Sequence, residues 1–111
     1  MALLTLVVVL LATAGSASAA TGTIQVGSGT LVARGAAVDL PVTVSLTCDE
    51  GFTSGLVDLF LSQAQGRTLA TGEGRAQASC TGETQTVTVR VFSFGVPFHG
   101  GSALANATLL Q

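Results

Sequence analysis

The sequence has no tryptophan, no tyrosine and no lysine, and it contains one histidine and two cysteines among 111 residues. Tryptophan and tyrosine supply the aromatic faces on which carbohydrate modules usually stack sugars, so their absence argues against a carbohydrate-binding module. The net charge is -2 and the four arginines are scattered. A protein that binds nucleic acid needs a basic stripe to neutralise phosphates. The sequence therefore argues against nucleic acid as a partner.

Residues for catalysis are equally scarce. His99 is the only histidine, it lies in the glycine-flanked stretch PFHGG, and no Gly-x-Ser-x-Gly elbow occurs. Asp49 and Glu50 are the only adjacent carboxylates, and neighbours in a turn point in different directions, whereas paired catalytic carboxylates face one substrate. Two lone cysteines and one histidine lack the spacing of metal ligands. We expect a protein that is not an enzyme and that holds no metal and no cofactor.

The N-terminus has the shape of an export signal. An unbroken apolar block, Leu6–Ala12, is followed by small residues, although no lysine or arginine precedes it. Leu3–Ala12 is too short to cross a hydrocarbon core, which needs about 20 residues. Ala17-Ser18-Ala19 offers a small-x-small cleavage site. We expect residues 1–19 to be removed as a signal peptide and residues 20–111 to form one secreted, extracellular domain without a membrane span; an uncleaved anchor is the alternative.

The two cysteines of an exported chain are expected to be oxidised together. Cys48 and Cys80 form the only internal pair available. Closing a loop of about 33 residues restricts the unfolded chain by about 3.5 to 4 kcal/mol on the chain-entropy model. The sequence therefore predicts a stabilising disulfide.

Apolar and polar residues alternate through most of the remaining chain. The clearest run is AVDLPVTVSLTC, Ala37–Cys48, in which every second residue is apolar. Similar short runs are separated by turns rich in glycine at near-regular spacing. This pattern predicts an all-β fold, an antiparallel immunoglobulin-like β-sandwich of about seven strands. The residues expected in its core include Val38, Leu40, Val42, Val44, Leu46, Val87, Val89 and Val91.

Two segments in the middle of the chain need separate interpretation. Gly55–Gln63 fits a strand with Val57, Leu59 and Leu61 inward, and it also fits a short helix; we favour the strand because its neighbours are strands. Gly72-Glu73-Gly74 reads as a turn. We therefore expect one brief strand before it and a second strand beginning at Arg75.

Three of the five phenylalanines, Phe92, Phe94 and Phe98, gather near the loop from Gly95 to Gly101. The cluster is either a plug at one end of the sandwich or a contact patch, and we favour the plug. Phe94, Phe98 and His99 are the candidate contact residues of this loop.

Several spaced motifs resemble a family of small exported actinobacterial proteins of unknown function. The matching stretches are Cys80-Thr81-Gly82-Glu83, Gln85–Val89 and Pro97–Ala103, with further similarity at Arg34–Ala37 and Gln63–Arg67. These motifs consist of turn and strand residues. The resemblance therefore implies a fold and an exported location, and it implies no activity.

Two functions follow as expectations. The first is a secreted non-enzymatic module that is structural or interacts with another protein or with the cell envelope. The second is a small secreted inhibitor or ligand-binding protein that acts through the loop from Gly95 to Gly101. Burial of Phe94 and Phe98 would favour the first, and an open cleft lined by phenylalanine would favour the second. The sequence does not indicate an oligomeric state.

Overall fold

The computed structural model describes residues 5–14 and 21–110, and within them the chain is built almost entirely of strands. The one helical segment of the described residues is a three-residue 3-10 turn, η1 (Ala33–Gly35). The predicted all-β class is confirmed. In chain order the strands are β1 (Thr5–Ala14), β2 (Thr21–Val26), β3 (Gly29–Val32), β4 (Ala37–Thr47), β5 (Ser54–Gln65), β6 (Thr68–Ser79), β7 (Thr84–Ser93) and β8 (Gly101–Leu110).

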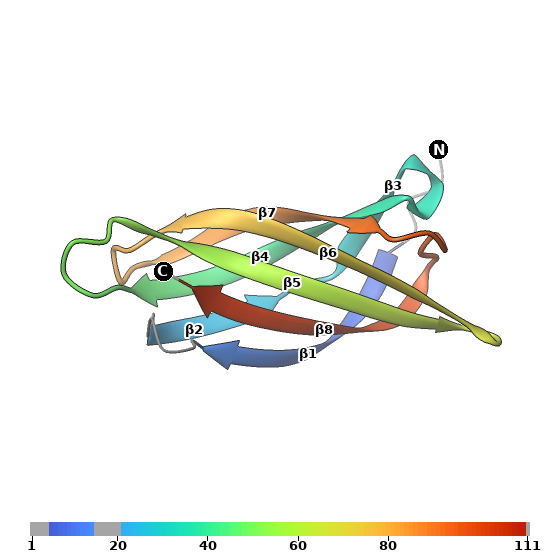
Figure 1. The fold of residues 1–111 in the computed structure, drawn as a ribbon, viewed down its shortest axis with the longest axis horizontal. Coiled ribbons are helices and arrows are strands. Elements are labelled where there is room, and N and C mark those ends of the chain that lie inside the picture. The colour runs from blue at the N-terminus through green and yellow to red at the C-terminus, as the bar shows by residue number, and fades with distance from the viewer. Residues whose placement is uncertain (1–4, 15–20, 111) are drawn as a thin grey trace.

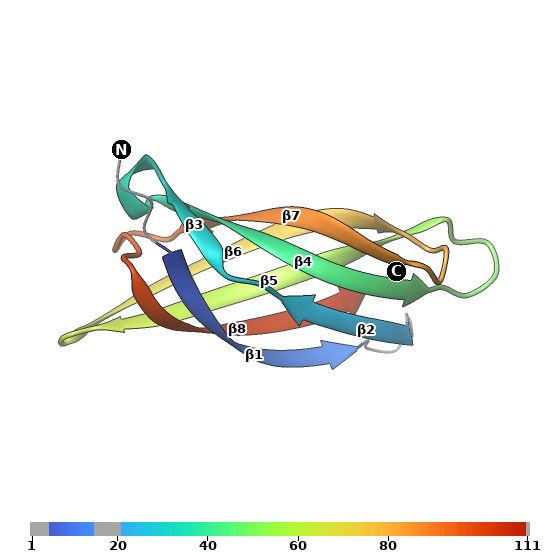
Figure 2. The same cartoon turned by 180° about the vertical axis from the view of Figure 1, so that it is seen from behind.

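The strands form one sheet in the order β2-β4-β3-β1-β8-β5-β6-β7, which closes on itself because β4 also pairs with β7. The ladders are antiparallel except that between β1 and β8, which is parallel. Long ladders join β4 to β7 and β5 to both β6 and β8, whereas β6 meets β7 at only two residue pairs. The closed sheet is therefore nearly barrel-shaped, and we call its two opposite sides the two layers. Figure 1 looks onto β5, β6 and β8, and Figure 2 shows β2, β3 and β4 from behind.

The core lies between these two layers and follows the alternation of the sequence. In β4 every second side chain from Val38 to Leu46 is fully buried, and Pro41 and Thr43 between them are exposed. Of the predicted core residues, Val87 alone is only partly buried, because it lies in the first half of β7, where the inward positions of the strand are less enclosed. The opposite layer contributes Val57, Leu59 and Leu61 from β5 and small alanines from β8.

Gly55–Gln63 is a strand, as favoured from the sequence, since β5 runs unbroken through it. The turn expected at Gly72-Glu73-Gly74 is wrong, because β6 continues straight through these residues. A Cβ atom at Gly72 would lie 2.4 Å from the Phe92 carbonyl oxygen, and one at Gly74 would lie 2.2 Å from that of Arg90. These glycines allow β6 to cross close over the backbone of β7 and do not mark a turn.

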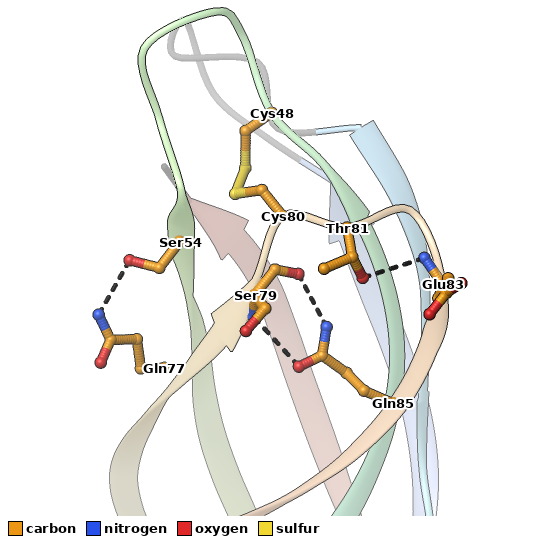
Figure 3. Close-up of a disulfide and its surroundings, with 8 residues drawn as sticks. All are labelled: Cys48, Ser54, Gln77, Ser79, Cys80, Thr81, Glu83 and Gln85. Atoms are coloured by element: carbon orange, nitrogen blue, oxygen red, sulfur yellow. Dashed lines mark hydrogen bonds between the residues drawn. A yellow bond between two sulfur atoms is a disulfide. The ribbon is translucent and has the colours of Figure 1, made fainter.

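The predicted disulfide between Cys48 and Cys80 is present, with the two Cα atoms 5.5 Å apart. Cys48 follows β4 and Cys80 follows β6, so the bond joins the two layers at the end where β6 and β7 diverge (Figure 3). Beside it, Gln85 of β7 bridges to β6. Its Nε2 donates to the Ser79 carbonyl oxygen at 2.8 Å and its Oε1 accepts from the Ser79 backbone N–H at 3.1 Å.

Residues 5–14, which contain the apolar block of the expected export signal, form β1 in the full-length chain. The cleavage motif Ala17-Ser18-Ala19 lies outside the described residues, so removal of residues 1–19 stays a prediction. Within the described part of the chain, no helix combines the length and apolar character needed to cross a bilayer.

We predict that Cys80→Ala lowers the free energy of unfolding by about 2 to 5 kcal/mol, because the loop between β4 and β6 is then no longer closed in the unfolded state. Chemical denaturation measures this change. The Cys48→Ala/Cys80→Ala double variant serves as control, because it removes the bond without leaving a free thiol. Equal stability of the oxidised and reduced parent protein would contradict the prediction.

A second substitution tests the crossing of β6 over β7. Gly74→Ala should lower the free energy of unfolding by about 1 to 3 kcal/mol, since its methyl group has no room beside the Arg90 carbonyl. Gly95→Ala is the matched control, because a Cβ atom at Gly95 meets no atom within 4 Å. A Gly74→Ala variant as stable as the control would show that the two strands lie farther apart.

Candidate functional site

The loop of residues 95–101 packs into the end of the fold through Phe98. The Phe98 side chain is buried, with 2% of its surface exposed. Its backbone N–H donates to the Gly35 carbonyl oxygen at 2.8 Å. Gly35 has a positive φ of 89°, and a Cβ atom there would lie 1.9 Å from the Phe98 carbonyl oxygen. The loop therefore sits directly on the turn η1, and Phe98 acts as a plug.

Glutamine side chains of β5 hold the same loop. The Gln63 side chain is 1% exposed, its Oε1 accepts from the His99 backbone N–H at 2.9 Å, and its Nε2 donates to the His99 carbonyl oxygen at 2.8 Å. Gln65 Nε2 also donates to the Pro97 carbonyl oxygen. Both backbone groups of His99 are therefore paired. Its imidazole is exposed, and Nδ1 lies 2.6 Å from the Gly100 carbonyl oxygen.

The other candidate contact residue, Phe94, lies on the opposite side of the strand layer from Phe98. It is 66% exposed, and its ring centroid is 6.4 Å from that of Phe60, with the rings tilted by 44°. Phe92, which is 59% exposed, lies in the same row of residues as Phe60, since each of them pairs with Glu73 of β6. The structure thus separates the predicted phenylalanine cluster into an inner plug and an outer surface.

We call this outer surface the phenylalanine face. Two exposed leucines extend it toward the turn between β5 and β6: Leu104 pairs with Ser62, two residues beyond Phe60, and Leu69 pairs with Ala64. The phenylalanine face lies on the outward side of the β8-β5-β6-β7 layer, where Phe60 and Phe94 are in ring contact and Glu73 lies between Phe60 and Phe92. Its apolar members are Phe60, Leu69, Phe92, Phe94 and Leu104.

A shallow hollow of about 250 Å³ opens beside this surface, where β5 and β8 part beyond the pair Ser62–Leu104. Its lining contains no ionisable side chain, and its volume lies just below the range of about 300 to 1,000 Å³ typical of small-molecule pockets. The hollow suits a small uncharged apolar group. It is lined by Ser62, Gln63, Ala64, Leu69, Ser102, Ala103 and Leu104.

Arg90 and Asp39 form an ion pair between neighbouring strands, and so do Arg75 and Asp58. Arg90 binds Asp39 through two hydrogen bonds of 2.7 and 2.8 Å across the β4–β7 ladder. This hydrogen bonding, supported by the guanidinium charge, holds the pKa of Asp39 below its ordinary value. Asp49 and Glu50 are exposed in the turn after Cys48. Among the described residues, no three His, Cys, Asp or Glu side chains lie close enough together to hold a metal ion.

Sequence reasoning did not single out Phe60 or Gln63. Phe60 was nevertheless accessible to it, because a strand with Val57, Leu59 and Leu61 inward must place Phe60 outward. The same alternation places Gln63 inward, where a buried amide needs hydrogen-bonding partners. Those partners, the backbone groups of His99, are 36 residues away in sequence and could not be identified by periodicity.

Comparison with protein-family models, with curated proteins and with solved structures found no match for this chain.

We predict that Gln63→Ala lowers the free energy of unfolding by about 1 to 3 kcal/mol, because the His99 backbone groups then lose their buried partners. Thermal or chemical denaturation measures the effect. Gln77→Ala is the matched control: this glutamine bonds one exposed hydroxyl, that of Ser54, and its loss should change stability by less than about 0.5 kcal/mol. Similar losses in the two variants would mean that the loop does not depend on Gln63.

Proposed function

We propose that the protein is an exported, non-enzymatic interaction module that presents the phenylalanine face to a partner protein or to the cell envelope. In this proposal residues 1–19 direct export and are removed, and residues 20–111 form an immunoglobulin-like domain. The observation that carries the proposal is the exposed aromatic group Phe60, Phe92 and Phe94 on a hydrogen-bonded strand layer.

Export is supported by features at separate places in the chain. The apolar block followed by small residues fits a signal peptide. The bond between Cys48 and Cys80 is of the kind that persists in oxidising compartments outside the cytoplasm.

An immunoglobulin-like arrangement is supported by the pairing of the strands. The neighbours β2-β4-β7 correspond to strands A, B and E of such a sandwich, and β6-β5-β8 correspond to C′, C and F. The disulfide differs from that of antibody domains, since it joins the ends of β4 and β6 and not the strands equivalent to B and F.

Binding through the phenylalanine face is supported by its composition and by its position. Large apolar side chains on a soluble surface mark interaction sites when they are contiguous, and aromatic residues dominate the energetics of protein interfaces. Glu73 lies between Phe60 and Phe92 and 3.6 Å from the Arg75 guanidinium. The aromatic surface therefore has polar groups through which a partner can be oriented.

A second candidate function, a small secreted ligand carrier, is favoured by the apolar hollow between β5 and β8. In this version the ligand contacts Leu69 and Leu104, and not the buried Phe98 of the plug. A Leu104→Arg variant that loses binding of a small apolar dye, with an unchanged melting temperature, would favour the carrier over the interaction module.

The proposed function predicts two results in the source cells. Protein recovered from outside the cytoplasm should begin at Ala20, as read by N-terminal sequencing. Cross-linking to a partner in the culture medium or envelope fraction should be lost in a Phe60→Ser/Phe94→Ser variant, because the aromatic contacts are removed while the core is untouched.

The matched control is Thr43→Ala/Thr88→Ala, which changes two exposed threonines of β4 and β7 outside the phenylalanine face. It should retain the cross-linked product. Equal cross-linking by the phenylalanine variant would refute the role of this face, and recovery only in membranes with Met1 in place would refute export by cleavage.

A further inference from the structure

Strand β1 occupies a distinct position in the fold. It pairs with β8 in parallel over nine consecutive residues, from Leu6 opposite Gly101 to Ala14 opposite Leu109. On its other side it meets β3 only at Thr5 and Leu6. Residues 5–14 therefore lie mainly along β8, in a position that we call the slot. They include the apolar block of the expected signal peptide.

Removal of residues 1–19, as in the proposed function on which this inference rests, takes away the strand that pairs with β8 on one side and leaves β5 on the other, so in the chain of residues 20–111 that side of β8 is a sheet edge. The backbone N–H and C=O groups of β8 that bond to β1 then lose these partners. Natural edge strands are usually protected by charge, proline or a bulge. β8, with the sequence GSALANATLL, has no charged residue and no proline, and its ladders with β1 and β5 run without a bulge.

We propose that the edge of β8 is a strand-acceptor site, into which a partner protein inserts an extended, uncharged apolar segment parallel to β8. Addition of a strand to an exposed edge is a known mode of peptide recognition, with backbone hydrogen bonds providing affinity and alternate side chains providing specificity. The occupant has the chemistry of residues 5–14, because that segment is the one seen in the slot.

The side chains of β8 define this chemistry further. Its inward residues Ala103, Ala105 and Ala107 are small and buried, and the register sets Val8 and Leu10 opposite the first two. Because side chains at paired positions of neighbouring strands interact, we expect an occupant with large aliphatic residues at the two positions that pair with these alanines. A second copy of β8 would set alanine largely against alanine, so we favour the partner segment over a dimer.

A synthetic peptide of residues 5–14, extended by two C-terminal lysines for solubility, tests the site on the oxidised chain of residues 20–111. The readouts are fluorescence anisotropy of the labelled peptide and amide hydrogen exchange. The peptide should bind and slow exchange across residues 101–110, while residues 37–47 of β4 serve as an internal reference. The same peptide with Val8→Asp and Leu10→Asp should bind at least about tenfold more weakly, which corresponds to about 1.4 kcal/mol.

The orientation of the bound peptide provides a second, more specific test. A nitroxide on the N-terminus of the peptide should broaden amide signals near Gly101 more than those near Leu109, because the pairing is parallel. If residues 20–111 are unfolded alone, circular dichroism reads the same site. Folding on addition of the peptide, and not of its aspartate control, supports the proposal, and no folding with either overturns it.

Three further outcomes overturn the proposal: no binding by a folded chain, equal binding of both peptides, or a dimer in which β8 is protected without peptide. The last would assign the edge to a second copy. Because residues 1–19 are removed beforehand, failure here is distinct from failure of the proposed function, which N-terminal sequencing of the natural protein and the phenylalanine variants decide.

Discussion

The two layers of this fold must be held together although the strand that links them, β6, pairs with its successor β7 at only two residue pairs. Over the rest of its length β6 belongs with β5, and β7 belongs with β4. At the end where β6 and β7 diverge, the bond between Cys48 and Cys80 joins the layers covalently. At the other end the glycines of β6 lie against the backbone of β7. The disulfide and the close contact of the glycines with β7 therefore fix the distance between the two layers, and with it the position of the phenylalanine face.

Glutamine side chains serve the same purpose where strands no longer pair. Gln63 and Gln85 each engage both the N–H and the C=O of one backbone residue, His99 and Ser79 respectively. A primary amide offers a donor and an acceptor side by side, so it substitutes for a neighbouring strand at a point where the chain turns away. This accounts for a buried polar residue in a core that is otherwise apolar. It also explains why the loop of residues 95–101 is fastened to the fold at its centre.

The sequence predicts the strands well because apolar and polar residues alternate with a period of two in a half-buried strand. Leu40 and Val89 are buried and Thr43 is exposed as that period requires. The turn predicted at Gly72 and Gly74 is wrong because glycine occurs both in turns and where two backbones approach closely. Which of the two applies here depends on β7, a strand that the local sequence does not reveal. The phenylalanine cluster expected from the sequence is split in the structure, with Phe98 buried and Phe94 exposed. Phe98 lies inside through a contact with Gly35, more than sixty residues away, whereas Phe94 follows the outward phase of β7. The apolar block at residues 5–14 has two physical readings, because the same composition suits a targeting segment and a buried strand.

The ladder between β4 and β7 joins residues 37–45 to residues 84–92, and this separation determines the order in which the domain can form. During synthesis, which proceeds from the N-terminus, β4 can pair with β2 and β3 as soon as it is made, but it cannot pair with β7 until most of the chain has been made. The hairpin of β5 and β6 is local and is available much earlier. Ladders between distant segments form slowly because the intervening chain must be closed first. The nascent chain therefore passes through an interval in which β4 is paired with β2 and β3, and β5 with β6, before the ladder that closes the sheet can form.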